Sequence, residues 1–376
     1  MKDAREELAG PGPGDYAELE GELPRGYEAQ LGPKDTQIAI AEVKQIIEEG
    51  LCRELGLIRV QVPLIVDAAS GVNDYLDRDG SRTPVRFHIP NDGDRNPIDA
   101  EVVQAATKWK RMALAQFEMQ PGEGLYTDMH AIRKDYFLDH DHSAFVDQWD
   151  WERAIRAEDR NLEYLTDVVR RIWRVLKDAE HGVRDAFPAL RSSGHPELPE
   201  EISFIHAEQL LERYPDLSRK QRETAALREH PALFIYGIGW PLADGLPHEL
   251  RAADYDDWAS EVRASDGRLT HGLNGDILVM NPVTGRRHEL SSMGIRVDAA
   301  TLQEQLEMSG QLELMRHDYH QAILKGDLPQ SIGGGIGQSR TYMLLLGKAH
   351  IGEVSVSVWP EILKAMCRRR NIYVLE

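Results

Sequence analysis

A glycine-rich stretch near the end of the sequence, SIGGGIGQSR (residues 331–340), limits the possible folds more than any other feature. A dinucleotide-binding loop would need G-x-G-x-x-G spacing with most of a parallel sheet downstream, and this stretch offers neither. A Walker loop would continue with lysine and serine or threonine, where Gln338 and Ser339 stand. The stretch therefore predicts a glycine-rich turn or strand end that opens a helix, with Arg340 either at a phosphate or in solvent.

Length and composition exclude several classes of protein. The 376 residues suffice for one large domain or two ordinary ones. The net charge of −19 disfavours a nucleic-acid partner, whose phosphates would need basic surface. Two cysteines without CxxC spacing predict neither a disulfide framework nor a zinc knuckle. Because no apolar run approaches about 18 residues and the start lacks a signal sequence, we expect a cytoplasmic protein without a membrane partner.

The sequence predicts an acidic, flexible N-terminal extension over residues 1–34 and a single domain over residues 35–376. Apolar residues recur at helical spacing from Asp35 to Leu55, and Gly56 ends this helix. An alternating strand then follows up to Pro63. Loops are expected from 67 to 96. Further helices are expected at 99–117, 160–179, 207–214, 218–230, 299–308, 312–325 and 341–348. Strands are expected at 145–152, 202–206, 232–236, 276–281 and 288–297. The hairpin-like connections favour an α+β fold, in which helices flank an antiparallel β-sheet.

The segment FVDQWDWE (residues 145–152) predicts a strand with two different faces. Side chains alternate along a strand, so Trp149 and Trp151 share an apolar face, and Gln148, Asp150 and Glu152 share a polar one. Such a polar face suits an amino-acid substrate, although a solvated edge strand would give the same pattern.

Two further groups of residues indicate phosphate chemistry. Asp276 and Glu289 lie on the two strands of a predicted hairpin, where a pair of carboxylates suits magnesium. Ser292 would share their face only if a bulge interrupted the alternation. The basic run KWKR (residues 108–111) would align Lys108 and Arg111 on a helix and point Lys110 elsewhere, and a solvated basic face would give the same pattern. Arg133 is a further candidate cation for a phosphate. Histidine pairs with metal-ligand spacing lack a third convergent ligand, so no metal is predicted at positions 140 and 142 or 317 and 320.

Long strings of the sequence resemble the ammonia-dependent asparagine synthetase family. They span roughly residues 36 to 360, almost the whole globular part, and read QVPLI, KWKR, GEGLYT, VDQWDWER, LLERYPDL (residues 210–217), ADYDDW, GLNGDILV, ELSSMGIRVD and IGGGIGQSR. The family is similar to the catalytic core of class II aminoacyl-tRNA synthetases. The resemblance implies that fold, a homodimer built on the helix–strand–Pro63 unit, and ATP held near Arg133 and Arg340.

The resemblance implies a two-step reaction that needs ATP and Mg²⁺. Aspartate would attack the α-phosphorus of ATP through its side-chain carboxylate, and ammonia would then convert the acyl-adenylate to asparagine and AMP. It implies catalytic roles for Arg133, Arg340 and Asp74. It implies aspartate binding by Lys110, Gln148, Asp150, Asp256 and Ser292. It implies ATP binding by Arg133, Glu289, Gly335, Gly337 and Arg340, and metal binding by Asp276 and Glu289.

Three positions depart from the family pattern and keep alternatives open. Gln104 and Ala105 stand where the family has His-Ser, and Trp240 stands where a glycine is common. The segment after Asp74 is also longer and differently charged. These changes leave room for a related amide ligase that joins aspartate, or a close relative of it, to another amine. A non-catalytic regulatory protein is a further alternative, which the retained phosphate-side residues oppose.

Overall fold

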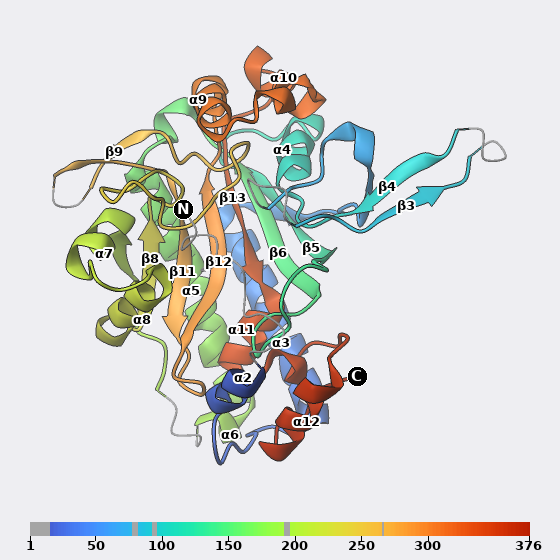
Figure 1. Ribbon diagram of the computed structural model, residues 1–376, viewed down its shortest axis with the longest axis vertical. Coiled ribbons are helices and arrows are strands. Elements are labelled where there is room, and N and C mark those ends of the chain that lie inside the picture. The colour runs from blue at the N-terminus through green and yellow to red at the C-terminus, as the bar shows by residue number, and fades with distance from the viewer. Residues whose placement is uncertain (1–15, 77–81, 92–95, 192–195, 265–266) are drawn as a thin grey trace.

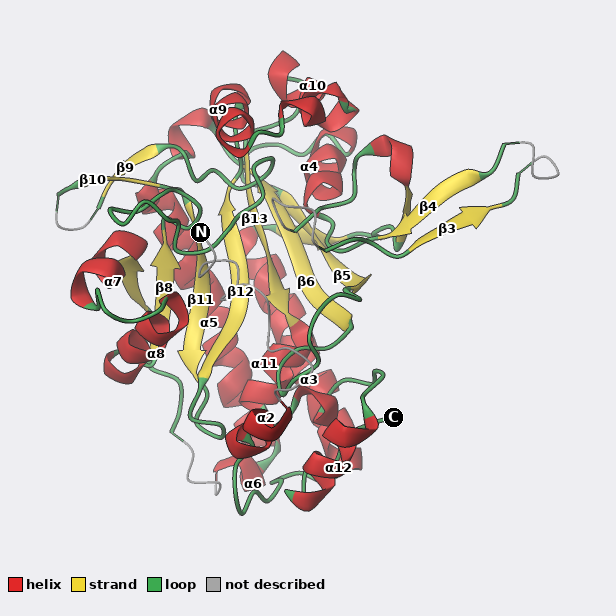
Figure 2. Cartoon of the chain, in the orientation of Figure 1, coloured by secondary structure: helices red, strands yellow, loops and turns green. Residues whose placement is uncertain are grey.

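The computed structural model contains a central sheet of eight strands with helices packed against it (Figures 1 and 2). It describes all residues except 1–15, 77–81, 92–95, 192–195 and 265–266. The strand order is β1-β5-β6-β13-β12-β11-β8-β7. The sheet is antiparallel except at its edges, where β1 pairs with β5 and β7 with β8 in parallel. Its strands are β1 (Leu57–Arg59), β5 (Gly124–Ile132), β6 (Phe145–Ala154), β7 (Ser203–His206), β8 (Ala232–Tyr236), β11 (Asn274–Met280), β12 (Arg287–Ile295) and β13 (Ser331–Gly337).

The described chain also contains smaller strands and α-helices. One small sheet is built from β2 (Ile65–Asp67), β3 (Arg86–Ile89) and β4 (Ile98–Val102), and another from β9 (Glu261–Arg263) and β10 (Leu269–His271). The helices are α2 (Tyr16–Glu22), α3 (Pro33–Leu55), α4 (Thr107–Gln116), α5 (Leu162–Ala186), α6 (Pro188–Arg191), α7 (Ala207–Arg213), α8 (Arg219–Glu229), α9 (Ala299–Ser309), α10 (Asp318–Lys325), α11 (Gln338–Leu345) and α12 (Glu361–Arg369). No helix in the described part of the chain combines the length and apolar character needed to cross a bilayer.

The main core lies between the sheet and the long helices α3 and α5, which run behind it in Figure 1. Val43, Ile47 and Leu51 of α3 are fully buried there, as their spacing predicts. The two helices approach closely at Gly50, where a Cβ atom would come within 2.7 Å of Val175. Gly56 ends α3 in the left-handed conformation. The predicted helix and its terminating glycine are thus confirmed.

Several expectations about local structure were wrong or incomplete. The predicted helix 99–117 divides into strand β4 and helix α4, because β4 pairs with a strand on each side. The expected loops from 67 to 96 include β3, which forms with β4 an arm that projects from the body of the molecule (Figure 1). Strand β5, which lies next to the edge strand β1 of the sheet, was not predicted. Helix α12 near the C-terminus was missed as well.

The segment from residue 16 to residue 34 also differs from the expected flexible extension. Leu19, Leu23 and Leu31 are buried in the main core cluster. The Tyr27 hydroxyl donates a hydrogen bond to Glu353 at 2.9 Å. The large apolar residues of this segment are few, but the leucines are spaced so that they reach the core. Residues 1–15 of the predicted extension lie outside the described residues.

Candidate active site

Strand β6 divides the molecule into an apolar side and a polar side. Trp149 and Trp151 are fully buried in the core on one face. Gln148, Asp150 and Glu152 alternate with them and so project from the other face. Because β6 lies between β5 and β13, this polar face belongs to the middle of the sheet. The predicted two-faced strand is confirmed, and the alternative of an edge strand is excluded.

The glycines of β13 make room for these polar side chains. A Cβ atom at Gly333 would lie 2.0 Å from a carboxylate oxygen of Glu152, and one at Gly335 would lie 2.4 Å from the Gln148 amide oxygen. Any larger residue would therefore push the Glu152 or Gln148 side chain away from the sheet. Gly337 is less crowded, since its nearest neighbour would be the Cβ of Arg340 at 3.4 Å. The glycine-rich stretch thus forms a strand that supports a polar floor.

Buried ion pairs lie across this floor. Arg296 donates to both carboxylate oxygens of Glu152, at 2.8 to 3.2 Å, and pairs with Asp256 on its other side. The Ser331 hydroxyl donates to Glu152 at 2.7 Å. Burial of these charges is tolerable only because each is paired and hydrogen-bonded. The predicted residue Asp256 is therefore held by Arg296, a residue that the sequence did not single out.

Lys110 and Asp150 form a second buried pair on the same floor. The Lys110 ammonium donates to Asp150 and to the carbonyl oxygen of Trp151, the latter at 3.0 Å. One carboxylate oxygen of Asp150 is buried without a hydrogen-bond partner in the described structure. The structure therefore brings together Lys110, Asp150 and Gln148 as the sequence predicts, and leaves Asp150 able to accept another donor.

A β-bulge brings Asp276 and Ser292 together. The register between β11 and β12 shifts between Ile277 and Leu278, so that Asp276 pairs with Ser292 and Leu278 pairs with Glu289. This shift places Asp276, Glu289 and Ser292 on one face of the sheet. The bulge that Ser292 needed in order to share this face is therefore present. The predicted hairpin would have Glu289 face Asp276 directly across the two strands, whereas here Glu289 pairs with Leu278.

Arg251 binds both Asp276 and Ser292. Its guanidinium pairs with the Asp276 carboxylate and donates to the Ser292 hydroxyl at 2.6 Å. Burial raises the pKa of Asp276 to about 7, although Arg251 acts to lower it, and the nearby charge of Glu289 raises it further. An added cation would therefore stabilise the charged form of the Asp276 carboxylate. Arg251 was missed because its partners lie far along the chain in a different element.

The two predicted phosphate-binding arginines have few competing anions. Arg340 donates to the carbonyl oxygens of Asp141 and Glu289 at 3.3 and 3.2 Å, and its nearest carboxylate oxygen is that of Glu289 at 3.6 Å. Arg133 donates to the carbonyl oxygen of Gln104 at 3.2 Å. In the part of the chain that the structure describes, no carboxylate pairs with Arg133. Both guanidinium groups can therefore still take up an anionic ligand.

Asp74 occupies a structural position at the start of α4. Its carboxylate accepts the backbone N–H of Thr107 at 2.5 Å and that of Lys108 at 3.4 Å, which caps the helix from a distant segment. Asp74 is fully buried, and burial raises its pKa to about 6 against the lowering effect of Lys108. Lys108 in turn pairs with Asp254 at 3.0 Å. The predicted catalytic residue is thus part of a buried cluster at the end of the floor.

The three departures from the family pattern have different surroundings. Gln104 is buried, and its amide nitrogen has no hydrogen-bond partner in the described structure. Ala105 follows it and is also buried. Trp240 stacks on the ring of His271, with 3.9 Å between ring centroids and 7° between planes. Gln104 is joined to the candidate site by the hydrogen bond that its carbonyl oxygen accepts from Arg133.

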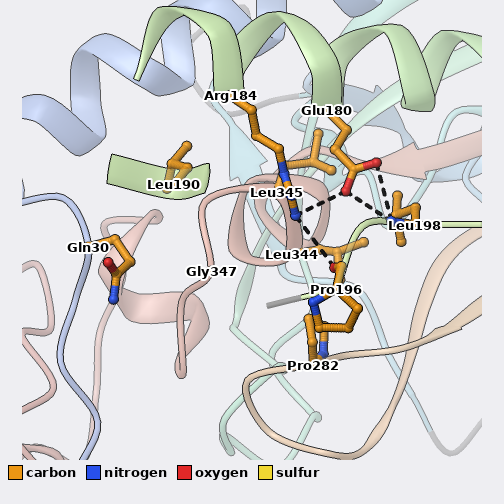
Figure 3. Close-up of a pocket in the computed structure, with 10 residues that line it drawn as sticks. All are labelled: Gln30, Glu180, Arg184, Leu190, Pro196, Leu198, Pro282, Leu344, Leu345 and Gly347. Carbon is orange, nitrogen blue, oxygen red and sulfur yellow. Dashed lines mark hydrogen bonds and ion pairs between the residues drawn. The ribbon is translucent and has the colours of Figure 1, made fainter. Parts of the chain in front are cut away.

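A small cavity lies elsewhere, between α5 and the segments that follow α11 and β11 (Figure 3). Its volume of about 20 Å³ suits a single water molecule and no substrate. Glu180 and Arg184 point toward one another across its rim and bind the backbone of Leu198 and Pro196. The cavity contains none of the predicted site residues, which all belong to the sheet face or its borders.

Comparisons with known proteins agree with this architecture. The sequence model of the aspartate-ammonia ligase family matches residues 34–371 of this chain. An aspartate–ammonia ligase of Clostridium tetani is 45% identical over 353 residues, which cover 94% of this chain and 97% of the relative. One from Bacillus cytotoxicus is 45% identical over 348 residues, 93% and 99% of the two chains.

Solved structures with the same fold are class II aminoacyl-tRNA synthetases. The asparaginyl-tRNA synthetase of Pyrococcus horikoshii, complexed with asparaginyl-adenylate, has a TM-score of 0.63 at 13% identity, and the match covers 87% of this chain and 70% of that one. The aspartyl-tRNA synthetase of Entamoeba histolytica has a TM-score of 0.55 at 15% identity, with 85% and 58% covered. At such identities the likeness shows the fold alone, which is the predicted α+β core.

Proposed function

The chain belongs to the aspartate–ammonia ligase family, and we propose that its reaction takes place on the polar face of β6, β13, β12 and β11. The enzyme is a ligase that forms a C–N bond between ammonia and the side-chain carboxylate of aspartate, with ATP as the energy source. Asparagine, AMP and pyrophosphate are its products. The near full-length matches favour ammonia over another amine.

Arg340 and Arg133 would neutralise the phosphates of ATP during the first step. The aspartate carboxylate attacks the α-phosphorus, the bond to pyrophosphate breaks, and negative charge builds up on the phosphate oxygens. Preorganised cations at such oxygens are worth several kcal/mol of barrier, about 3–4 for a single donor. The observation that carries this assignment is the guanidinium of Arg340, which is held by two carbonyl oxygens and keeps only a 3.6 Å contact to a carboxylate.

Asp276 and Glu289 would hold Mg²⁺. Their carboxylates share a face because of the bulge, and oxygen ligands together with substrate phosphates are what Mg²⁺ prefers. Burial raises the pKa of Asp276, and this supports the assignment, since a second cation would stabilise the charged form of its carboxylate. When bound, the ion would supply charge neutralisation. Arg251 would orient Asp276 and Ser292, whose hydroxyl then faces the same space.

The remaining predicted residues would surround aspartate. Gln148 and Asp150 offer an amide and an unpartnered carboxylate oxygen, which suit the carboxylate and ammonium groups of an amino acid. Lys110 holds Asp150 in place, and Arg296 holds Asp256.

In the second step ammonia attacks the acyl carbon, AMP leaves, and the nitrogen loses a proton. Asp74 or Asp256 would take that proton or bind the α-ammonium. Gly335 and Gly337 would let ATP approach the backbone.

We further propose that residues 35–376 form one catalytic domain, against which residues 16–34 pack. We also propose that the enzyme is a cytoplasmic homodimer whose subunits meet over α3 and β1. Strand β1 is an edge of the main sheet, and Ile58 on it is 55% exposed. Ile38 on α3 is 51% exposed. An edge strand with exposed apolar side chains is open to pairing with another chain.

Two substitutions separate the proposed phosphate and aspartate roles. Arg340→Ala should lower AMP formation at least about 100-fold, while Gln148→Ala should raise the KM for aspartate and leave that for ATP unchanged. AMP release at varied aspartate and ATP gives both values. Arg228→Ala, at an exposed arginine of α8, is the matched control and should behave like the wild type. Full activity of Arg340→Ala would show that the phosphates bind elsewhere.

A further inference from the structure

Three consecutive side chains converge in the segment between β5 and β6. Asp139, His140 and Asp141 each offer one ligand atom, and these atoms all lie within 4.8 Å of one another. The sequence pattern DHDH suggested two histidine ligands without a third. The structure instead combines one histidine with the aspartates on either side of it.

His140 is the feature that points to a ligand. Its side chain is 9% exposed, and neither ring nitrogen has a hydrogen-bond partner. The nearest carboxylate oxygens, one from Asp139 and one from Asp141, are each 4.0 Å away. In the described structure, every other buried histidine with one unpartnered ring nitrogen forms a hydrogen bond through its second ring nitrogen. A buried polar group without partners costs about 1–3 kcal/mol, so a fully unpartnered ring implies a missing partner.

The two carboxylates are already fixed in position by their surroundings. Asp139 accepts the backbone N–H groups of Asp141 and His142, each at 2.9 Å. The Nδ1 atom of His142 lies 2.9 Å from an oxygen of each aspartate, and that of His288 lies 3.6 Å from Asp141. A cation would share the carboxylates with His142, using lone pairs that this ring leaves free.

We propose that Asp139, His140 and Asp141 bind a divalent transition-metal cation of the Zn²⁺ type. Imidazole nitrogen with carboxylate oxygen is a donor set that suits Zn²⁺ and its neighbours, whereas Mg²⁺ prefers oxygen alone. Three protein ligands leave a position for water. The site differs from the Mg²⁺ site proposed at Asp276 and Glu289.

The bound cation would also act on the nucleotide side of the enzyme. The carbonyl oxygen of Asp141 accepts a hydrogen bond from Arg340 at 3.3 Å. A metal that fixes the 139–141 segment therefore fixes one of the two carbonyl oxygens that position Arg340. This consequence rests on the proposed role of Arg340, whereas the metal site itself does not.

Equilibrium dialysis of metal-free, tag-free protein against Zn²⁺, followed by metal analysis, tests the proposal. We expect one bound equivalent per chain. Its affinity should fall at least ten-fold in His140→Asn and in Asp141→Asn. His181→Asn, at an exposed histidine of α5, should bind like the wild type. Melting curves establish that each variant is folded.

Two results would overturn the proposal. One is wild-type binding no tighter than that of folded His140→Asn. The other is displacement of the bound Zn²⁺ by millimolar Mg²⁺, which would make the site one for hard cations. Because dialysis is done without ATP, Arg340→Ala should still bind Zn²⁺ even though it is inactive. The metal site and the proposed catalytic role can therefore fail separately.

Discussion

At the scale of single residues, the candidate site depends on side chains whose partners come from distant parts of the chain. Site residues such as Gln148, Asp150 and Ser292 could be predicted from the sequence, because strand alternation and the segments that resemble the family indicate them. It could not supply Arg251 or Arg296, whose roles follow from the loop and strand positions that bring them to Asp276 and Glu152. The polar face was predictable, and its ion pairing was not.

Asp74 gives a prediction about pH at this scale. Its pKa is raised from 3.8 to about 6 in the folded protein, so the folded state holds the proton more tightly than the unfolded state. Ionisation as the pH rises from about 4 to 6 therefore lowers stability, by up to about 3 kcal/mol. Asp74→Asn, which resembles the protonated acid and can still cap α4, should escape this loss.

The measurement for Asp74 is the difference in Tm between Asp74→Asn and the wild type at several pH values. The difference should move in favour of the variant between pH 4 and pH 7, because other groups titrate alike in both proteins. A constant difference over that range would contradict a raised pKa at Asp74.

At the scale of elements, the sequence predicted helices that pack against the sheet, including α3 from its apolar spacing, and also α5 and α8. It failed where an element is defined by its neighbours. Residues 98–102 form β4 because β2 and β3 pair with it, and no local feature of those residues marks a strand. The same reason explains β5, a strand held by β1 and β6.

The glycine-rich strand β13 yields the second prediction. Gly333→Ala should lower the free energy of unfolding by about 1–3 kcal/mol, because its Cβ would meet Glu152 at 2.0 Å and Arg296 at 2.6 Å. Chemical denaturation measures the change. Gly21→Ala is the control, since a Cβ there meets nothing within 4 Å and alanine favours the helix α2. Equal stability of wild type and Gly333→Ala would show that β13 tolerates side chains.

At the scale of the whole molecule, the N-terminal segment is part of the fold from residue 16 onward. Its glycine and proline content predicted a loose extension, but burial of a few well-spaced leucines outweighs that composition. Its neighbours include residues close to the C-terminus, since Tyr27 binds Glu353 and the Lys348 ammonium binds the carbonyl oxygen of Leu31. Contacts of such sequence separation cannot be read from local patterns.

Leu23→Ala tests this docking. Leu23 is 2% exposed, and its truncation should cost about 2–4 kcal/mol of unfolding free energy. Glu28→Ala, at an exposed position of the same segment, should leave the stability within about 0.5 kcal/mol of the wild type. Denaturant titration measures both variants. If Leu23→Ala were as stable as Glu28→Ala, the segment would not be packed in solution.

The central claim is that this enzyme joins ammonia to aspartate by way of AMP formation. The most direct test supplies purified protein with Mg-ATP, aspartate and ¹⁵N-labelled ammonium, and follows AMP, pyrophosphate and the amino-acid product by mass spectrometry. We predict ¹⁵N-asparagine in equal amount to AMP, with the label in the side-chain amide. Formation of AMP without labelled asparagine, or no AMP at all, would contradict the assignment.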